Sequence, residues 1–313
     1  MDRTNNTFRF RSYAKINWFL KIGQRRQDGY HNILSIMQVI NLYDVIDLYF
    51  PKNCDEIICN YEIPTGAESL LGRLFHLIRG LNPGMSEIGF GLNIKKNIPP
   101  ASGLGGASSN AATVLKIMNS ILRLELSQER LIELSATLGS DIPFFTAGYP
   151  FAVIGGRGEK ITPLPHPPQR DLVLVFPKLG VNTGWAYQEW DHHHESLEPY
   201  PILSIDGYLL HLESDHIENM ISNDFERIVF RHYPDLKDLK EWLEQLGCSK
   251  VFMTGSGSTI IGTAPNRVTA VEIVDRLRQK GMNTIWSTTA TRYDNDFLVC
   301  SGGGEESCQT PLF

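Results

Sequence analysis

The sequence predicts a protein of mixed class, with strands and helices layered as in α/β or α+β folds. Two patterns support this prediction. Segments with an apolar residue at every second position are typical of half-buried strands, and they alternate with segments whose leucines recur every three or four residues, as in amphipathic helices. The chain of 313 residues is long enough for one large domain or for two of ordinary size.

The first half of the chain contains most of the predicted strands. One begins at Phe8-Arg9-Phe10-Arg11, where apolar and charged residues alternate, and continues to Trp18. Further strands are predicted at 45–50, 56–61 and 90–96. Between them, residues 66–80 place several leucines on one face of a helix.

The central segments predict helices. A cluster of glycines at 103–106 opens into helical sequence at 110–118. A second helix is predicted to begin after Ser127, a good N-cap, and to end at Gly139. Residues 160–170 contain four prolines and are interpreted as a connector, so a domain boundary is expected nearby.

The last third of the chain returns to a strand and then to helices. A compact strand is predicted at 172–176, and residues 203–246 are mostly helical in pattern. Two short strands, 251–253 and 259–262, flank a second cluster of glycines.

Composition and charge exclude several classes of protein. Hydrophobic residues make up 42% of the chain and charged residues 20%, which is typical of a globular protein. The 29 basic and 35 acidic residues give a net charge of −6, which argues against a nucleic acid as the main partner. An anionic ligand must therefore be bound by local groups.

The compartment is predicted from the N-terminus, the apolar runs and the cysteines. Residues 1–6 contain no apolar segment of the kind that signal peptides have, and no apolar run reaches the ~18 residues of a membrane span. The five cysteines form no CxxC pair, so neither a disulfide framework nor a structural zinc site is predicted. We expect a reduced, cytoplasmic protein without a membrane partner.

The first glycine cluster has the arrangement of an anion site. A strand, a glycine-rich turn from Ser102 to Gly106 and a helix follow one another, so that free amides at the helix N-terminus can face a phosphate. The hydroxyls of Ser108 and Ser109 can add contacts to a phosphate or to a magnesium ion. The cluster matches neither G-x-x-x-x-G-K-[ST] nor G-x-G-x-x-G, and an ordinary flexible turn is an equally good interpretation of this cluster alone.

The second glycine cluster, Thr254-Gly255-Ser256-Gly257-Ser258, lies between two predicted strands. On its own it predicts a tight hairpin turn. Its meaning depends on the other motifs of the chain.

Three segments together resemble the GHMP kinase superfamily, which includes galactokinase and the homoserine, mevalonate and phosphomevalonate kinases. They are Ser12–Leu20 with Arg26–His31, Pro99–Ala112, and Thr254–Ser258. Gly139–Phe145 and Asn223–Glu226 are further similar to the branch of the superfamily that acts on 4-diphosphocytidyl-2-C-methyl-D-erythritol. The match extends from residue 12 to about 262, over most of the chain.

The resemblance implies a two-domain α+β fold with the active site in the cleft between the domains. The N-terminal domain, residues 1–162, resembles domain 2 of ribosomal protein S5 and binds ATP. The C-terminal domain, residues 163–301, is ferredoxin-like, and residues 302–313 are expected to form a flexible tail. The implied reaction transfers the γ-phosphoryl group of ATP to the 2-hydroxyl of the diphosphocytidyl substrate in the non-mevalonate route to isoprenoid precursors.

The resemblance also assigns roles to residues. Asp141 matches the catalytic aspartate that accepts the hydroxyl proton, and Lys15 matches the catalytic lysine. Without the resemblance, a solvated strand lysine and a helix N-cap or loop carboxylate are the simpler interpretations. The implied ATP loop contains Pro99, Pro100, Ala101, Ser102, Gly103, Leu104, Gly105, Gly106, Ala107, Ser108 and Ser109. Mg²⁺ is expected as cofactor, with Ser108 as a weak candidate ligand.

The implied substrate residues are Asn17, Tyr30, His31 and Tyr187, with His31 at the cytosine edge and Tyr187 as a stacking ring. Ordinary packing is the alternative for the two tyrosines. Asn182 and Met37 depart from the residues usual at their positions, which affects the expected stacking. Gly255, Ser256 and Gly257 are expected to form a wall beside the reacting groups and to support the phosphate loop, or to be structural only.

Two other functions stay open at the level of sequence. One is a GHMP kinase for a different small alcohol, to which a nucleobase pocket would be useless. The other is a non-catalytic member that binds a nucleotide as a sensor, against which the presence of both Lys15 and Asp141 argues.

Overall fold

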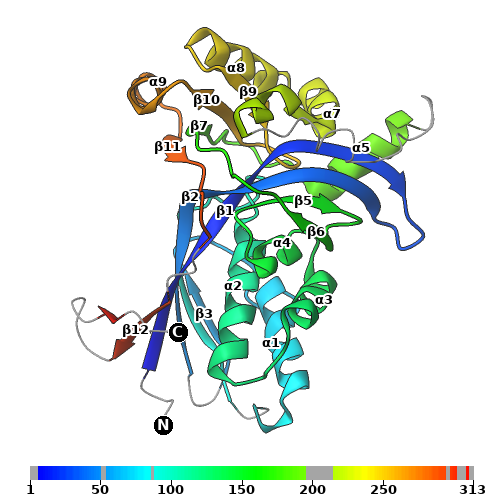
Figure 1. Cartoon of the computed structure of the whole chain (residues 1–313), viewed down its shortest axis with the longest axis vertical. Coiled ribbons are helices and arrows are strands. Elements are labelled where there is room, and N and C mark those ends of the chain that lie inside the picture. The colour runs from blue at the N-terminus through cyan, green and yellow to red at the C-terminus, as the bar shows by residue number, and fades with distance from the viewer. Residues whose placement is uncertain are drawn as a thin grey trace.

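The computed structural model describes residues 6–50, 54–85, 88–194, 214–293, 297–301 and 308–309 (Figure 1). Its strands are β1 Asn6–Arg25, β2 His31–Tyr49, β3 Glu56–Cys59, β4 Gly91–Lys95, β5 Phe151–Gly155, β6 Lys160–Pro163, β7 Asp171–Val175, β8 Ser222–Asn223, β9 Lys250–Met253, β10 Ile260–Ala264, β11 Thr284–Thr288, β12 Phe297–Ser301 and β13 Cys308–Gln309. Its α-helices are α1 Leu70–Leu81, α2 Gly106–Ile121, α3 Gln128–Leu138, α4 Ile142–Ala147, α5 Thr183–His194, α7 Asp224–His232, α8 Pro234–Gln245 and α9 Arg267–Gln279. Two 3₁₀ segments, η2 and η3, cover Pro83–Met85 and Ser214–Met220.

The larger sheet is built on a long antiparallel hairpin of β1 and β2. Its strands lie in the order β13-β12-β1-β2-β4-β3, while β5 also pairs with β2, β6 with β5, and β8 with β1. Helices α1 to α4 gather beside this sheet in Figure 1, and α2 contacts both β1 and β2. The hairpin therefore forms the scaffold onto which the N-terminal helices pack.

The smaller sheet has four antiparallel strands in the order β11-β7-β10-β9. Helices α8 and α9 lie beside it at the other end of the molecule (Figure 1), and both contact its strands. None of the helices in the described part of the chain is long and apolar enough to cross a membrane.

One face of β1 joins the two sheets. Ala14, Ile16 and Trp18 are fully buried, and they belong to an apolar cluster that includes Leu172 and Phe252 from the smaller sheet. The ring of Trp18 lies 5.4 Å from that of Phe252. Because successive side chains of a strand point to opposite faces, the residues between these three point to the other side of the sheet.

The sequence predicts helix α3 correctly at both ends. Ser127 is its N-cap, and its hydroxyl accepts a hydrogen bond from the amide of Arg130. Gly139 is its C-cap. In contrast, the sequence predicts strand β2 only at 45–50. Every residue from Ile33 to Ile40 is buried, so both faces of the strand are covered there and the sequence shows no apolar–polar alternation to recognise.

The chain between residues 160 and 171 passes from the larger sheet to the smaller one. The expected connector is partly wrong, because Lys160–Pro163 forms strand β6 on β5. Strand β7 of the smaller sheet begins at Asp171. We propose the division at residues 162 and 163 as the domain boundary, with two exceptions. Both β8 and β12 are assigned to the second domain, yet both pair with β1 in the larger sheet.

The expected flexible tail at 302–313 lies largely outside the described residues. Within it, Cys308–Gln309 forms β13, which pairs with β12.

Candidate active site

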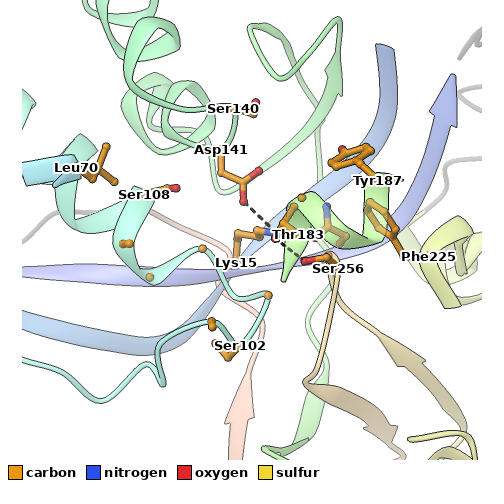
Figure 2. A pocket seen from close by; sticks show the side chains of 18 of the residues that line it. Lys15, Leu70, Ser102, Ser108, Ser140, Asp141, Thr183, Tyr187, Phe225 and Ser256 are labelled. Carbon is orange, nitrogen blue, oxygen red and sulfur yellow. Dashed lines mark hydrogen bonds and ion pairs between the residues drawn. The ribbon is translucent and has the colours of Figure 1, made fainter. Parts of the chain in front are cut away.

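A cavity of about 850 Å³ lies where the two sheets meet. Its walls include residues of β1, the glycine-rich loop before α2, the beginning of α4, helix α5 and the second glycine cluster. Figure 2 shows these segments around Lys15 and Asp141. Residues that are distant in the sequence thus share one site.

Lys15 and Asp141 form an ion pair in this cavity. The Lys15 ammonium lies 3.4 Å from Asp141 Oδ2 (Figure 2). Lys15 is buried, with 2% of its surface exposed, and its side chain points to the face of β1 opposite to that of its neighbours Ala14 and Ile16. Its ammonium also donates a hydrogen bond to Asn17 Oδ1 at 2.7 Å. The simple interpretation of a solvated strand lysine is therefore wrong.

Asp141 occupies the N-cap position of helix α4, yet its side chain makes no capping hydrogen bond. Its carboxylate faces Lys15 and the cavity instead, and about a third of the side chain is exposed. A residue at an N-cap without the capping contact leaves its oxygens available for another task.

Asn17 is held rigidly beside Lys15. Its side-chain amide donates to Ser35 Oγ at 2.8 Å, and its backbone amide donates to Thr254 Oγ1 at 3.0 Å. Asn17 therefore links β1 both to β2 and to the second glycine cluster. Its carbonyl oxygen fixes the Lys15 ammonium within the cavity.

The glycine-rich loop leads into α2 as the sequence predicts. Gly105 is the N-cap of α2 with φ of 72°, and no side chain caps the helix, so the first amides of α2 are free to bind an anion. The helix begins at Gly106, four residues earlier than predicted. Of the predicted ATP residues that the sequence places between Pro99 and Ser109, all but Leu104 and Ser109 line the cavity.

The two exceptions are buried in the interior. Leu104 is fully buried in the apolar cluster at the sheet junction, and its carbonyl accepts a hydrogen bond from the Lys15 amide. The hydroxyl of Ser109 accepts a hydrogen bond from Ser12 Oγ at 2.7 Å, inside the N-terminal domain. Leu104 and Ser109 therefore support the loop from the interior and do not line the cavity.

The second glycine cluster packs directly against the first. A Cβ placed on Gly103 would lie 2.4 Å from the carbonyl oxygen of Thr254, so only a glycine allows this approach. Gly255 and Ser256 line the cavity, whereas Gly257 does not. Ser256 Oγ also shares a hydrogen bond of 2.8 Å with Thr183 Oγ1 at the beginning of α5 (Figure 2).

The opposite end of the cavity is aromatic. The rings of His31 and Tyr187 are stacked on one another, with centroids 4.9 Å apart and planes at 11°. Phe225 meets Tyr187 edge to face at 4.9 Å. Burial, and secondarily the negative charge of Asp141, raises the pKa of Tyr187, so that its phenol stays protonated.

Tyr30 is more open than His31. Its side chain is 48% exposed, and the guanidinium of Arg157 lies 4.8 Å from the centre of its ring. Tyr30 and Arg157 both line the cavity. The predicted substrate residues Asn17, Tyr30, His31 and Tyr187 are therefore all in the cavity, although His31 and Tyr187 are stacked on each other in this structure.

Sequence reasoning missed Asp191, which orients His31. His31 Nε2 lies 2.7 Å from Asp191 Oδ1, and Arg25 approaches the other carboxylate oxygen at 3.4 Å. Asp191 follows Tyr187 by four residues on α5, so both lie on one face of the helix and both reach His31. This i, i+4 spacing relates Asp191 to Tyr187 in the sequence, but it does not predict the contact with His31.

Comparisons with known proteins show the family to which the chain belongs. The GHMP kinase N-terminal domain model matches residues 70–149, and the GHMP kinase C-terminal model matches residues 211–283. The 4-diphosphocytidyl-2-C-methyl-D-erythritol kinase of Thermodesulfovibrio yellowstonii is 35% identical over 265 residues, which cover 83% of this chain and 90% of that protein.

Two solved structures resemble the fold. A crystal structure of a 4-(cytidine 5'-diphospho)-2C-methyl-D-erythritol kinase matches with a TM-score of 0.72 and 29% identity, over 90% of this chain and 99% of the other. A homoserine kinase from Cytophaga hutchinsonii matches with a TM-score of 0.66 and 14% identity, over 96% and 99% of the two chains, and supports the fold alone. The chain belongs to the 4-diphosphocytidyl-2-C-methyl-D-erythritol kinase family of the GHMP kinases.

Proposed function

We propose that this chain transfers the γ-phosphoryl group of ATP to the 2-hydroxyl of 4-diphosphocytidyl-2-C-methyl-D-erythritol, in the non-mevalonate route to isoprenoid precursors. The observation that carries the proposal is the Lys15–Asp141 pair, which lies in one cavity between the glycine-rich loop and an aromatic end. The named relatives support the choice of substrate.

Asp141 is the proposed acceptor of the hydroxyl proton. As the alcohol oxygen forms its bond to the γ-phosphorus, the bond between that phosphorus and the bridging oxygen of ADP breaks, and the proton passes to the carboxylate. The Lys15 ammonium, 3.4 Å from that carboxylate, stabilises the negative charge on the transferred group. Asn17 keeps the ammonium in place through its 2.7 Å hydrogen bond.

The glycine-rich loop is the proposed site for the ATP phosphates. The amides at the beginning of α2 face the cavity without a capping side chain, and the helix dipole favours an anion there. This explains how an acidic chain of net charge −6 can bind an anionic nucleotide.

Mg²⁺ is the proposed cofactor. Among the described residues, no three histidine, cysteine or acidic side chains form a metal cage. The cavity instead offers the Ser108 hydroxyl, and such a sparse donor set fits an ion that keeps much of its water and binds phosphate oxygens. When bound, Mg²⁺ neutralises charge on the β- and γ-phosphates.

The cytidine end of the substrate is assigned to the aromatic part of the cavity. Tyr30 and Tyr187 offer ring faces for stacking, and His31, held by Asp191, offers a polar edge. Tyr187 must separate from His31 if the base is to lie between them. A kinase for a small alcohol such as homoserine has no use for these groups, so they favour the diphosphocytidyl substrate.

The proposed location is the cytoplasm. Cys54, Cys59 and Cys248, the cysteines whose side chains are described, are free thiols, as is usual in a reducing compartment.

An ADP-release assay tests this function. The enzyme is supplied with ATP, Mg²⁺ and, in turn, the diphosphocytidyl alcohol, homoserine and mevalonate. We expect turnover with the first acceptor alone. Turnover of a different alcohol in its place would establish another GHMP kinase, and ATP binding without turnover of any acceptor would favour a nucleotide sensor.

A further inference from the structure

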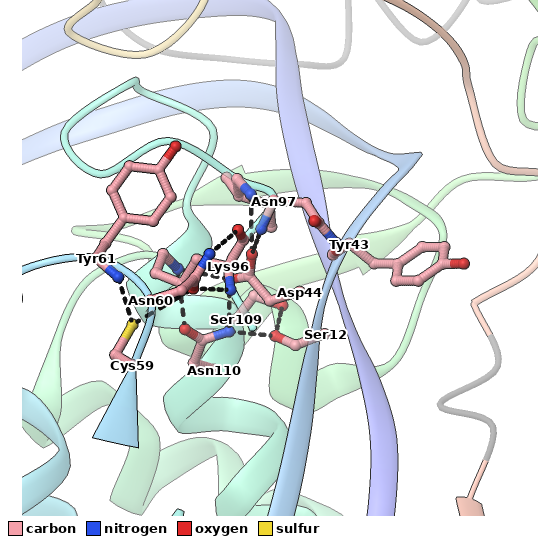
Figure 3. Close-up of polar contacts among 11 residues, drawn as sticks. Ser12, Tyr43, Asp44, Cys59, Asn60, Tyr61, Lys96, Asn97, Ser109 and Asn110 are labelled. Atoms are coloured by element: carbon pink, nitrogen blue, oxygen red, sulfur yellow. Dashed lines mark hydrogen bonds and ion pairs between the residues drawn. The ribbon is translucent and has the colours of Figure 1, made fainter. Parts of the chain in front are cut away.

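The carboxylate of Asp44 on β2 is fully buried and accepts four hydrogen bonds (Figure 3). The backbone amides of Asn97 and Ile98 donate to Oδ1 at 2.8 and 2.9 Å. The Lys96 ammonium and the side-chain amide of Asn110 donate to Oδ2 at 2.5 and 3.0 Å. Four hydrogen bonds offset the cost of burying this charge, and they hold the carboxylate in one position.

The four donors come from the two ends of the glycine-rich loop. Residues 96–98 directly precede Pro99, where the loop begins, and Asn110 lies in the second turn of α2, into which the loop leads. One carboxylate thus ties the entry of the loop to its exit.

A second set of contacts ties the exit of the loop to the strand that carries Lys15. The side-chain amide of Asn110 also donates to Ser12 Oγ at 2.9 Å, and Ser12 donates to Ser109 Oγ at 2.7 Å (Figure 3). Ser12 is on β1, three residues before Lys15. The position of the loop relative to the catalytic lysine therefore depends on this network.

Neither Asp44 nor Ser12 lines the cavity, whereas Lys96 and Asn110 do. The Lys96 ammonium lies 3.4 Å from the position of a Cβ on Gly106, the first residue of α2. The network therefore reaches the cavity wall at the N-terminus of the helix, while Asp44 and Ser12 stay behind that wall. Any effect of these two residues on a ligand must be transmitted through the loop.

We propose that Asp44 is a positioning residue for the ATP phosphates: it holds both ends of the glycine-rich loop, and the Lys96 ammonium beside them, in the geometry that binds the nucleotide. The inference rests on the proposed role of the loop in binding ATP. Because the loop amides need fixed directions to serve an anion, a loosened loop loses affinity for ATP before it loses the catalytic pair.

The test compares Asp44→Asn with Asp47→Asn. At position 44 the amide side chain keeps the shape of the carboxylate but removes its charge, and one of its two polar atoms cannot accept a hydrogen bond. Asp47 is the matched control, since it lies on the same strand and, like Asp44, does not line the cavity, but it pairs with Arg9 of β1 at 2.7 Å. Calorimetric titration with a non-hydrolysable ATP analogue measures the affinity of the loop for the nucleotide. The KM values for ATP and for the diphosphocytidyl alcohol show separately whether the nucleotide end or the alcohol end of the site is affected.

Asp44→Asn is expected to weaken binding of the analogue and to raise the KM for ATP by at least about tenfold, since hydrogen bonds to a charged group are the strong ones. The KM for the alcohol should stay within about twofold of wild type. A general loss of folded protein would lower kcat at unchanged KM values, and that result would overturn the proposal. So would an equal weakening of ATP in Asp47→Asn.

Ser12→Ala covers the case in which Asp44→Asn does not fold. It removes one hydroxyl outside the cavity, and we expect analogue binding to weaken by about threefold, as for a single neutral hydrogen bond. Wild-type affinity in this variant would contradict the proposed network. If wild-type protein binds the analogue but phosphorylates no diphosphocytidyl alcohol, the proposed function fails while the titrations still decide the role of Asp44.

Discussion

At the scale of single residues, the proposed chemistry depends on one carboxylate, that of Asp141, which makes no capping hydrogen bond to its own helix. Asp141 is placed at the beginning of α4 by the chain, but its side chain faces Lys15 instead of capping the helix. Asparagine and serine are both good N-cap residues, and neither can accept a proton as a carboxylate does. Substitution at this position therefore separates a structural role from a catalytic one.

We expect Asp141→Asn and Asp141→Ser to lower kcat by about 10²- to 10⁴-fold, the usual contribution of a general base. The thermal midpoint should change little, because Asp141 makes no capping hydrogen bond and the Lys15 ammonium keeps its hydrogen bond to Asn17. Steady-state ADP release gives kcat, and calorimetry with the ATP analogue should show retained binding. Near-normal turnover in either variant would remove Asp141 from the mechanism.

At the scale of elements, the glycine-rich loop depends on its contact with the second glycine cluster. Gly103 has φ of +79°, and its backbone approaches the Thr254 carbonyl so closely that a Cβ has no space. Gly281, at the end of α9, has a similar φ of +77° but no atom within 4 Å of the Cβ position. Comparing alanine substitutions at Gly103 and Gly281 therefore separates the cost of the left-handed backbone from the cost of the steric clash at Gly103.

Gly103→Ala is expected to raise the KM for ATP by about tenfold or more, because an overpacked contact costs about 1–3 kcal/mol and moves the loop. Gly281→Ala should lower stability by about 1–2 kcal/mol from its left-handed backbone. Its KM for ATP should equal that of wild type. If the two variants bind ATP equally well, the packing of the two clusters is not important for the nucleotide.

Helix α2 also contains a lysine in an unfavourable place. Burial lowers the pKa of Lys116 from 10.5 to about 8, and the nearby ring of Tyr293, 5.2 Å away, offsets part of that cost. Between these two pKa values the unfolded chain keeps a proton that the folded chain has lost. The free energy of unfolding therefore rises with pH between these two pKa values, because the cost of burying the charged ammonium disappears there.

Lys116→Met should accordingly raise the thermal midpoint at pH 7, and its advantage over wild type should shrink as the pH rises from about 8 to 10.5. Lys178→Met, at an exposed position, is the control for the loss of a positive charge. Thermal unfolding monitored by circular dichroism at several pH values measures both. An advantage that is independent of pH would show that burial of the ammonium is not its cause.

The elements show what the sequence could predict. Helix α3 is amphipathic and has a good cap at each end, so its bounds were predicted to the residue. Strand β2 is buried on both faces over much of its length, and the first turn of α2 begins within the glycine cluster, so local patterns understated both. The motifs of the loop and of Lys15 were found because a resemblance over most of the chain connected them.

At the scale of the whole molecule, the site forms where two sheets join. Long-range pairings such as Lys15 with Asp141, and His31 with Asp191, depend on how the hairpin of β1 and β2 crosses α4 and α5, and no local pattern contains that information. The same is true of β12, which returns from the end of the chain to pair with β1. The network of Asp44 was missed for this reason, since its partners are more than fifty residues away.

The most direct measurement of the central claim is ³¹P NMR of the wild-type enzyme with ATP, Mg²⁺ and 4-diphosphocytidyl-2-C-methyl-D-erythritol. The account predicts one new phosphomonoester resonance, formed in equal amount with ADP, while the diphosphate resonances of the substrate persist. The Asp141→Asn variant should leave the spectrum unchanged over the same time. Inorganic phosphate as the product, or ATP left intact beside the substrate, would contradict the account.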